Sequence, residues 1–304
     1  SSLMSDLVAM DKRGGYFGWR NKTLGLVTVA AGFLAGFILY KMAKFNKCYG
    51  FAVIFSVAFI FRLASWYFLT KMHEPPLNHK KEDQFTLIMF VRRLRESNFA
   101  KFVYFVAMIN FSVNLAAPFF PVLMLRDLHF SYALYAFITV TATLTVCLMM
   151  TRWGRFADRI GNLKIMKFTS PLIGIIPLLW ILNRHPIFLF FAQVFSGFAW
   201  AGFNLCASNF IYDAVTPEKR TRCIAYFNIF NGLALCLGSL LGGFLLQKLP
   251  YLFGYKILTL FLISSFFRIL VAFLMPLKLK EVRAVEKISH KDLFLSVIGI
   301  RRFL

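Results

Sequence analysis

A chain of 304 residues that is 59% hydrophobic, with 38 phenylalanines and only 13 acidic residues, does not have the composition of an ordinary soluble domain. Its formal net charge of +22 could suggest a nucleic-acid partner, but the basic residues lie mostly between hydrophobic runs, where a membrane surface explains them better. The five cysteines are scattered without metal-ligand or disulfide spacing. The composition therefore favours a polytopic membrane protein without metal, cofactor or nucleic acid.

Eight hydrophobic runs follow one another along the chain, each long enough to cross a bilayer as a helix rising about 1.5 Å per residue. The runs are continuously apolar instead of alternating, which favours helices over barrel strands. The predicted spans are Thr23–Tyr40, Phe51–Leu69, Phe102–Leu125, Ser131–Met150, Ile165–Leu182, Pro186–Tyr212, Ile224–Leu246 and Gly254–Leu277. The sequence thus predicts an all-α membrane protein with eight transmembrane helices.

The longest polar segment, residues 70–101, separates the second and third spans. Two consecutive prolines, Pro75 and Pro76, should end the second helix. Arginines at positions 92, 93 and 95 among apolar residues are typical of a basic helix on the membrane surface, and a flexible linker is an equally good interpretation. A second basic segment follows the last span at residues 278–304.

The distribution of lysine and arginine predicts the orientation of the spans. If the turn between the fourth and fifth spans is cytoplasmic, 26 of the 35 basic residues lie on the cytoplasmic side and seven lie on the other side. The remaining two, Arg62 and Arg268, fall within spans. The positive-inside rule therefore predicts that both chain ends are cytoplasmic.

An internal repeat relates the first two spans to the last two. Tyr16-Phe17, Asn21 and Gly32 recur 210 residues later as Tyr226-Phe227, Asn231 and Gly242. Arg62 and Arg268 also follow phenylalanines at nearly equal depths in their spans. This order indicates a parallel repeat of helices. Small residues with the spacing of close helix packing are Gly32, Gly36, Gly238, Gly242 and Gly243.

Residues Gly154–Met166 combine two glycines, one acid and three bases in a predicted tight turn between the fourth and fifth spans. The stretch resembles the signature loop of the major facilitator superfamily, Gly-x-Leu-Ala-Asp-Arg-x-Gly-Arg-Lys, then two residues and a large apolar one. The matching residues are Gly154, Ala157, Asp158, Arg159, Gly161 and Met166, whereas Phe156, Asn162 and Leu163 depart from the pattern. Gly161 is expected to adopt left-handed backbone angles.

The resemblance implies a secondary active transporter of two six-helix halves that moves a small organic solute by alternating access. Residues 1–69 would be the last two helices of the first half, 70–101 the loop between the halves, 102–277 the second half and 278–304 a cytoplasmic tail. A complete chain would then have four more helices before these eight. The resemblance is also compatible with a monomer in a bacterial cytoplasmic membrane, surrounded by lipids and coupled to protons or sodium.

A transporter-like protein that acts as a non-transporting sensor or scaffold is the alternative interpretation. No deep acid, histidine or nucleophile cluster supports an enzyme. The presence of a charged residue in the first or fourth helix of a complete chain would favour coupled transport.

Two pairs of polar residues are the candidate substrate-binding groups, and each pair is four residues apart and so shares a helix face. They are Asn110 and Asn114 on the third span, and Trp200 and Asn204 on the sixth. The resemblance implies that these two spans line a central cavity, although packing between helices would use the same residues equally well. Pro118 and Pro121 should kink the third span.

The charged candidates lie at a gate and within two spans. The resemblance implies that Asp158 contacts the start of a helix in the other half, here Arg20–Thr23, with Gly154, Arg159 and Gly161 completing the gating loop. A carboxylate is stabilised at a positive helix N-terminus. For Arg62 and Arg268, structural pairing with helix-end carbonyls or lipid phosphates is favoured over substrate contact.

Overall fold

The computed structural model describes residues 8, 12–42, 47–71 and 97–282. The long helices are α2 (Arg13–Met42), α3 (Lys47–Thr70), α5 (Asn98–Asn114), α7 (Tyr132–Ile160), α8 (Asn162–Leu182), α9 (Pro186–Ala214), α10 (Pro217–Lys248) and α11 (Lys256–Leu274). Short elements are α6 (Phe119–Val122), the π-helix η4 (Leu123–Asp127) and the 3-10 helix η5 (Pro276–Lys278). All eight predicted spans fall on helices, which confirms the all-α fold class.

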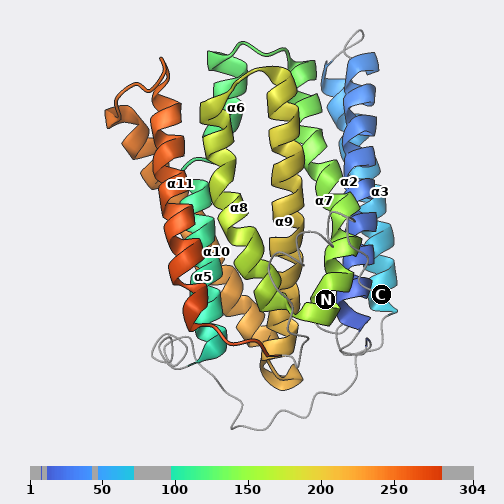
Figure 1. Ribbon diagram of the computed structural model, residues 1–304. Coiled ribbons are helices and arrows are strands. Elements are labelled where there is room, and N and C mark those ends of the chain that lie inside the picture. Colours follow the sequence, from blue (N-terminus) through green and yellow to red (C-terminus); the bar gives the residue numbers. More distant parts are fainter. Residues whose placement is uncertain (1–7, 9–11, 43–46, 72–96, 283–304) are drawn as a thin grey trace.

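Seven helical stretches of the described residues are long and apolar enough to cross a membrane. The helix α2 is not one of the seven, but it is 30 residues long and contains the predicted span Thr23–Tyr40. Figure 1 shows the long helices side by side in one bundle. Their length and composition identify an integral membrane protein.

Several helices continue beyond the predicted spans at the end that carries the signature residues. The helix α2 begins at Arg13 instead of Thr23, and α7 runs to Ile160 instead of Met150. Hydropathy marks the apolar middle of a membrane helix, whereas the backbone hydrogen bonds continue into polar turns. The predicted ends were therefore wrong by up to ten residues.

The third predicted span is interrupted where its two prolines predicted a kink. The helix α5 ends at Asn114, α6 begins at Phe119, and the N–H groups of Ala116 and Ala117 both donate to the Val113 carbonyl, at 3.1 and 2.9 Å. Pro118 has no N–H to donate, so the regular helical ladder cannot continue through this turn. The kink prediction is confirmed.

Three helices of the bundle each pack against two others. The helix α7 contacts α2 and α9, α8 contacts α9 and α11, and α5 contacts α10 and α11. Figure 1 shows α2 and α3 at one side of the bundle and α11 at the other. A Cβ atom added at Gly18 would lie 2.7 Å from the Met150 carbonyl oxygen, so the backbones of α2 and α7 are almost in contact.

The helix α3 presents an apolar surface along its whole length. None of its span is buried within the described structure, and Phe55, Phe59 and Phe61 are all exposed. A surface this large and apolar suits lipid hydrocarbon better than water. Arg62 is exposed on the same helix. The predicted surface helix at positions 92–95 and the tail after Val282 lie outside the described residues.

The predicted orientation can be tested at one position before α9 and one position after it, in a variant without the five native cysteines. Because 26 basic residues are expected on the cytoplasmic side, His185→Cys should react with a membrane-impermeant maleimide in intact cells. Lys219→Cys should react only after the membrane is permeabilised. The reverse labelling pattern would contradict the predicted topology.

Candidate functional site

The signature residues form the end of one helix instead of a tight turn. Gly154, Asp158 and Arg159 all belong to α7, and Gly161 alone separates α7 from α8, which corrects the predicted loop. Gly161 has φ 89° and ψ 156°, a backbone conformation that residues with a Cβ atom rarely adopt. Its predicted positive φ is confirmed, and the chain reverses through this one residue.

Asp158 contacts the beginning of α2. Its Oδ2 atom accepts a hydrogen bond of 2.8 Å from the Gly15 N–H, in the first turn of that helix. N–H groups of the first turn have no helical acceptor and carry partial positive charge, so the carboxylate is stabilised there. A helix start was expected, but the predicted position, Arg20–Thr23, was five residues too late because α2 begins before its apolar run.

An aromatic stack joins the start of α2 to α9. Phe17 is buried on α2, and its ring stacks on Tyr212 of α9 with centroids 5.2 Å apart. Arg159 is exposed in the last turn of α7, where a basic residue faces the negative helix end. The start of α2 is thus held by both α7 and α9.

The start of α8 carries a second carboxylate, which comes from the end of the described chain. Glu281 Oε2 accepts a hydrogen bond of 2.7 Å from the Leu163 N–H, and Asn162 donates to Asp213 Oδ2 at 2.7 Å. Sequence reasoning missed these contacts. They tie the start of α8 to α9 and to the segment after η5, which crosses the foot of the bundle in Figure 1.

The same segment is also tied to the start of α5. Asn98 donates to the Lys280 carbonyl at 2.8 Å and accepts from the Lys280 N–H at 3.0 Å. Residues 279–282 therefore connect α5 and α8 on the side of the bundle that carries the signature residues.

Of the two predicted substrate-binding amides of α5, one bonds to α10 and the other bonds within α5. Asn110 Nδ2 donates to Asn231 Oδ1 at 2.6 Å, and Asn114 Nδ2 donates to the Asn110 carbonyl at 2.8 Å. On α9, Trp200 is half-buried against Phe203, while Asn204 has an exposed side chain. The two predicted pairs therefore take part in different contacts.

Asn231 is a polar neighbour that the sequence reasoning did not assign to the site. It anchors its own amide by donating to the Phe227 carbonyl at 2.8 Å, which leaves its oxygen directed to Asn110. Its match to Asn21 in the internal repeat was the one sequence signal that could have identified it.

The two intramembrane arginines have different surroundings. Arg62 is exposed on α3, whereas Arg268 is only 2% exposed and donates to backbone carbonyls of Val113 and Ile173. Pairing of Arg268 with helix-end carbonyls was expected, and the Val113 carbonyl lies in the last turn of α5, whereas the Ile173 carbonyl lies inside α8.

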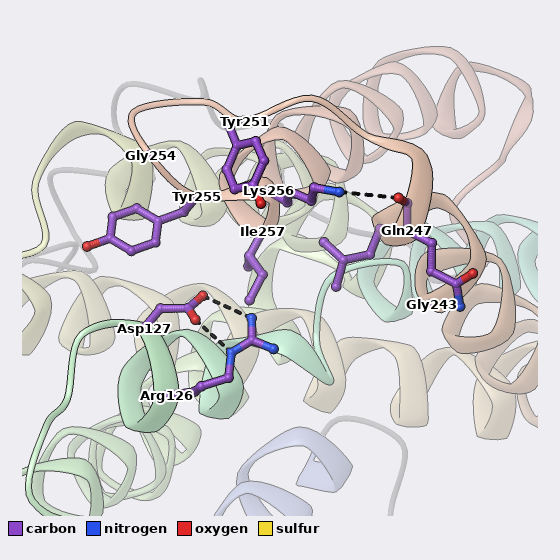
Figure 2. Close-up of a pocket in the computed structure, with 10 residues that line it drawn as sticks. Arg126, Asp127, Gly243, Gln247, Tyr251, Gly254, Tyr255, Lys256 and Ile257 are labelled. Carbon is purple, nitrogen blue, oxygen red and sulfur yellow. Dashed lines mark hydrogen bonds and ion pairs between the residues drawn. The ribbon is translucent and has the colours of Figure 1, made fainter.

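A pocket of about 580 Å³ lies between η4, the end of α10 and the start of α11 (Figure 2). Its polar wall contains the Arg126–Asp127 ion pair, with 2.7 Å between Nε and Oδ1, and Lys256, whose Nζ donates to the Gln247 carbonyl at 3.3 Å. The full lining is Arg126, Asp127, Gly243, Leu246, Gln247, Tyr251, Gly254, Tyr255, Lys256 and Ile257. The four predicted substrate-binding residues are not part of this lining.

The chain is similar in sequence to one protein family and to one characterised protein. Residues 100–303 match the family model described as Major Facilitator Superfamily. The chain is also 20% identical over 166 residues to Multidrug resistance protein 2 of Bacillus subtilis (strain 168). That match covers 54% of this chain and 41% of the relative, so the chain spans less than half the length of the protein it resembles.

Proposed function

This chain belongs to the Major Facilitator Superfamily, and on that basis we propose that it is part of a secondary transporter that moves a small organic solute across a membrane by alternating access. The observation that carries the proposal is the hydrogen bond between Asp158 and the start of α2. It links the two helix groups that the internal repeat assigns to different halves. Family membership also argues against an enzyme.

A movement between the two groups would break the Asp158 contact. A carboxylate at a helix N-terminus contributes roughly 0.3–2 kcal/mol, an amount that a transport cycle can break and re-form. Within residues 98–282, the bonds of Asn162, Glu281 and Asn98 tie several helices together. We propose that these helices move as one body relative to α2 and α3, with Asp158 as a gate contact.

The proposed substrate site lies between α5 and α9, with Asn231 of α10 added to the four residues predicted from the sequence. Amides offer both donors and acceptors, and the Trp200 indole offers a flat apolar wall with one donor. Such a lining suits a neutral or amphipathic organic solute better than an inorganic ion. The name of the Bacillus relative, a multidrug resistance protein, is compatible with this solute class.

The remaining parts of the proposal concern the setting of transport. We propose a monomer in a bacterial cytoplasmic membrane, with both termini of this chain in the cytoplasm and with protons or sodium as the coupling ion. The charge asymmetry supports the orientation. A pH gradient and a sodium gradient, imposed separately on vesicles, would distinguish the two ions.

The proposal predicts the effect of removing single amides from the complete protein. Asn114→Ala and Asn204→Ala should each raise the KM for a transported solute about 2- to 10-fold, the effect of one lost hydrogen bond. Uptake into vesicles measures the KM, and gel filtration measures the folded yield, which should stay normal. Asn183→Ala, outside the helices, is the control.

Two outcomes would contradict this assignment. Loss of folded protein with an unchanged KM in the remainder would assign both asparagines to packing. Absence of saturable transport by the complete wild-type protein would favour the non-transporting sensor or scaffold.

A further inference from the structure

The break in α5 leaves backbone acceptors without their usual helical donors. The Ala116 N–H, which would serve Ser112 in a regular helix, donates to Val113 instead. Ser112 is fully buried, so its carbonyl needs another donor. Ser264 of α11 supplies one, with its Oγ donating to the Ser112 carbonyl at 2.6 Å.

A second helix packed against α11, α8, also has a backbone carbonyl without its helical donor. Pro177 lies inside α8, and because proline has no N–H, the Ile173 carbonyl four residues earlier has no helical donor. Arg268 Nη1 donates to this oxygen at 3.3 Å. The backbones of α8 and α11 are close here, since a Cβ added at Gly174 would lie 3.2 Å from the Ile269 backbone nitrogen.

The planar guanidinium of Arg268 contacts both of these interrupted helices. Its Nε donates to Ser264 Oγ at 3.0 Å and its Nη2 to the Val113 carbonyl at 3.2 Å, while Nη1 reaches Ile173. The guanidinium has five N–H donors in a fixed plane, a geometry that the single ammonium of lysine cannot reproduce. Its acceptors are neutral oxygens, so oriented dipoles surround the buried charge.

The Arg268 contact is next to a proposed substrate-binding residue. Val113 directly precedes Asn114, whose amide donates to the Asn110 carbonyl one turn earlier. Asn110 in turn donates to Asn231. The direction of this last turn of α5 therefore depends on the bonds that hold the Ser112 and Val113 carbonyls.

We propose that Arg268, acting through Ser264, is a positioning residue for the substrate site: it holds the break of α5 so that Asn110 and Asn114 keep their orientation. This inference rests on the proposed function for its link to transport. The positioning of α5 can be measured without transport.

Two adjacent buried serines provide a matched test. Ser264→Ala removes the bond to α5, whereas Ser265→Ala removes a bond of 2.5 Å to the Gly174 carbonyl of α8. Each variant loses one buried serine–carbonyl bond, and Ser264→Ala also removes the acceptor of the Arg268 Nε–H, so it should lose more stability than Ser265→Ala. Only Ser264→Ala should raise the KM of the complete protein, by about fivefold. Arg268→Lys should have a larger effect, up to about 100-fold, since it loosens two carbonyl contacts at once.

A chemical readout separates this inference from the transport proposal. In a variant without the native cysteines, the rate at which Asn114→Cys reacts with a small polar thiol reagent reports the orientation of this turn. Ser264→Ala should change that rate about fivefold, and Ser265→Ala should leave it unchanged. Equal effects of the two serine variants would overturn the positioning role. If the wild type does not transport but the rates differ as expected, the transport proposal fails and the positioning role stands.

Discussion

Replacing Gly242 with valine is expected to cost the protein most of its folded yield. A Cβ atom at this position would overlap the Leu115 carbonyl oxygen, and one at Gly238 would lie 2.6 Å from the Phe111 carbonyl oxygen. Both obstacles are backbone atoms of α5, which cannot rotate away as a flexible side chain can. Overpacking of this kind typically costs about 1–3 kcal/mol or more, and α5 is the main neighbour of α10.

The next residue supplies the control for this prediction. A Cβ at Gly243 meets no atom within 4 Å, so Gly243→Val should fold normally. Gly243→Ala should be slightly more stable than the wild type, by up to about 1 kcal/mol, because alanine favours helix more than glycine does. Thermal unfolding and gel filtration in detergent measure both effects. Equal losses for Gly242→Val and Gly243→Val would contradict the close contact.

These glycines also show what spacing alone can predict. The sequence predicted that Gly32, Gly238, Gly242 and Gly243 were all packing residues. The structure places Gly238 and Gly242 against α5, whereas Gly32 and Gly243 face open space among the described residues. Spacing shows that a helix has a small-residue face, but the position of a partner backbone is a tertiary fact.

Features with a local cause were predicted well. Continuous apolar length gave the eight helices, the missing N–H of Pro118 gave the break in α5, and the absent Cβ of Gly161 gave its positive φ. The helix ends were not predicted, since the polar first turns of α2 and the last turns of α7 have no hydropathy signal.

Contacts between distant parts of the chain could not be derived from the residues alone. Asn98 meets Lys280 across 182 residues, Leu163 meets Glu281 across 118, and Asn110 meets Asn231 across 121. Each of these polar side chains could instead bond to its own helix or to solvent, so local sequence gives no reason to pair them. The contact of Asp158 with a helix start was foreseen through the family resemblance, and even there the partner position needed correction.

The charge of Asp158 should control the balance between the two states of the proposed gate. In Asp158→Asn the amide oxygen can still accept the Gly15 N–H, so this change isolates the interaction of the charge with the α2 N-terminus. Losing roughly 0.3–2 kcal/mol should shift the ratio of cytoplasm-open to cytoplasm-closed states about 2- to 30-fold toward the open one. Asp158→Ala, which also removes the acceptor, should shift it further.

A cysteine pair that replaces the stacked rings of Phe17 and Tyr212 can report this shift. The two cysteines would be close enough to cross-link only while the ends of α2 and α9 are together. Oxidative cross-linking between Phe17→Cys and Tyr212→Cys should slow in the Asp158→Asn background. Gly15→Ala is the matched control, since it keeps the N–H and its added Cβ would lie at an ordinary 3.6 Å from Asp158 Oδ2. Unchanged cross-linking in Asp158→Asn would show that the carboxylate is not a gate, whereas slowing in Gly15→Ala as well would show that the contact depends on shape and not on charge.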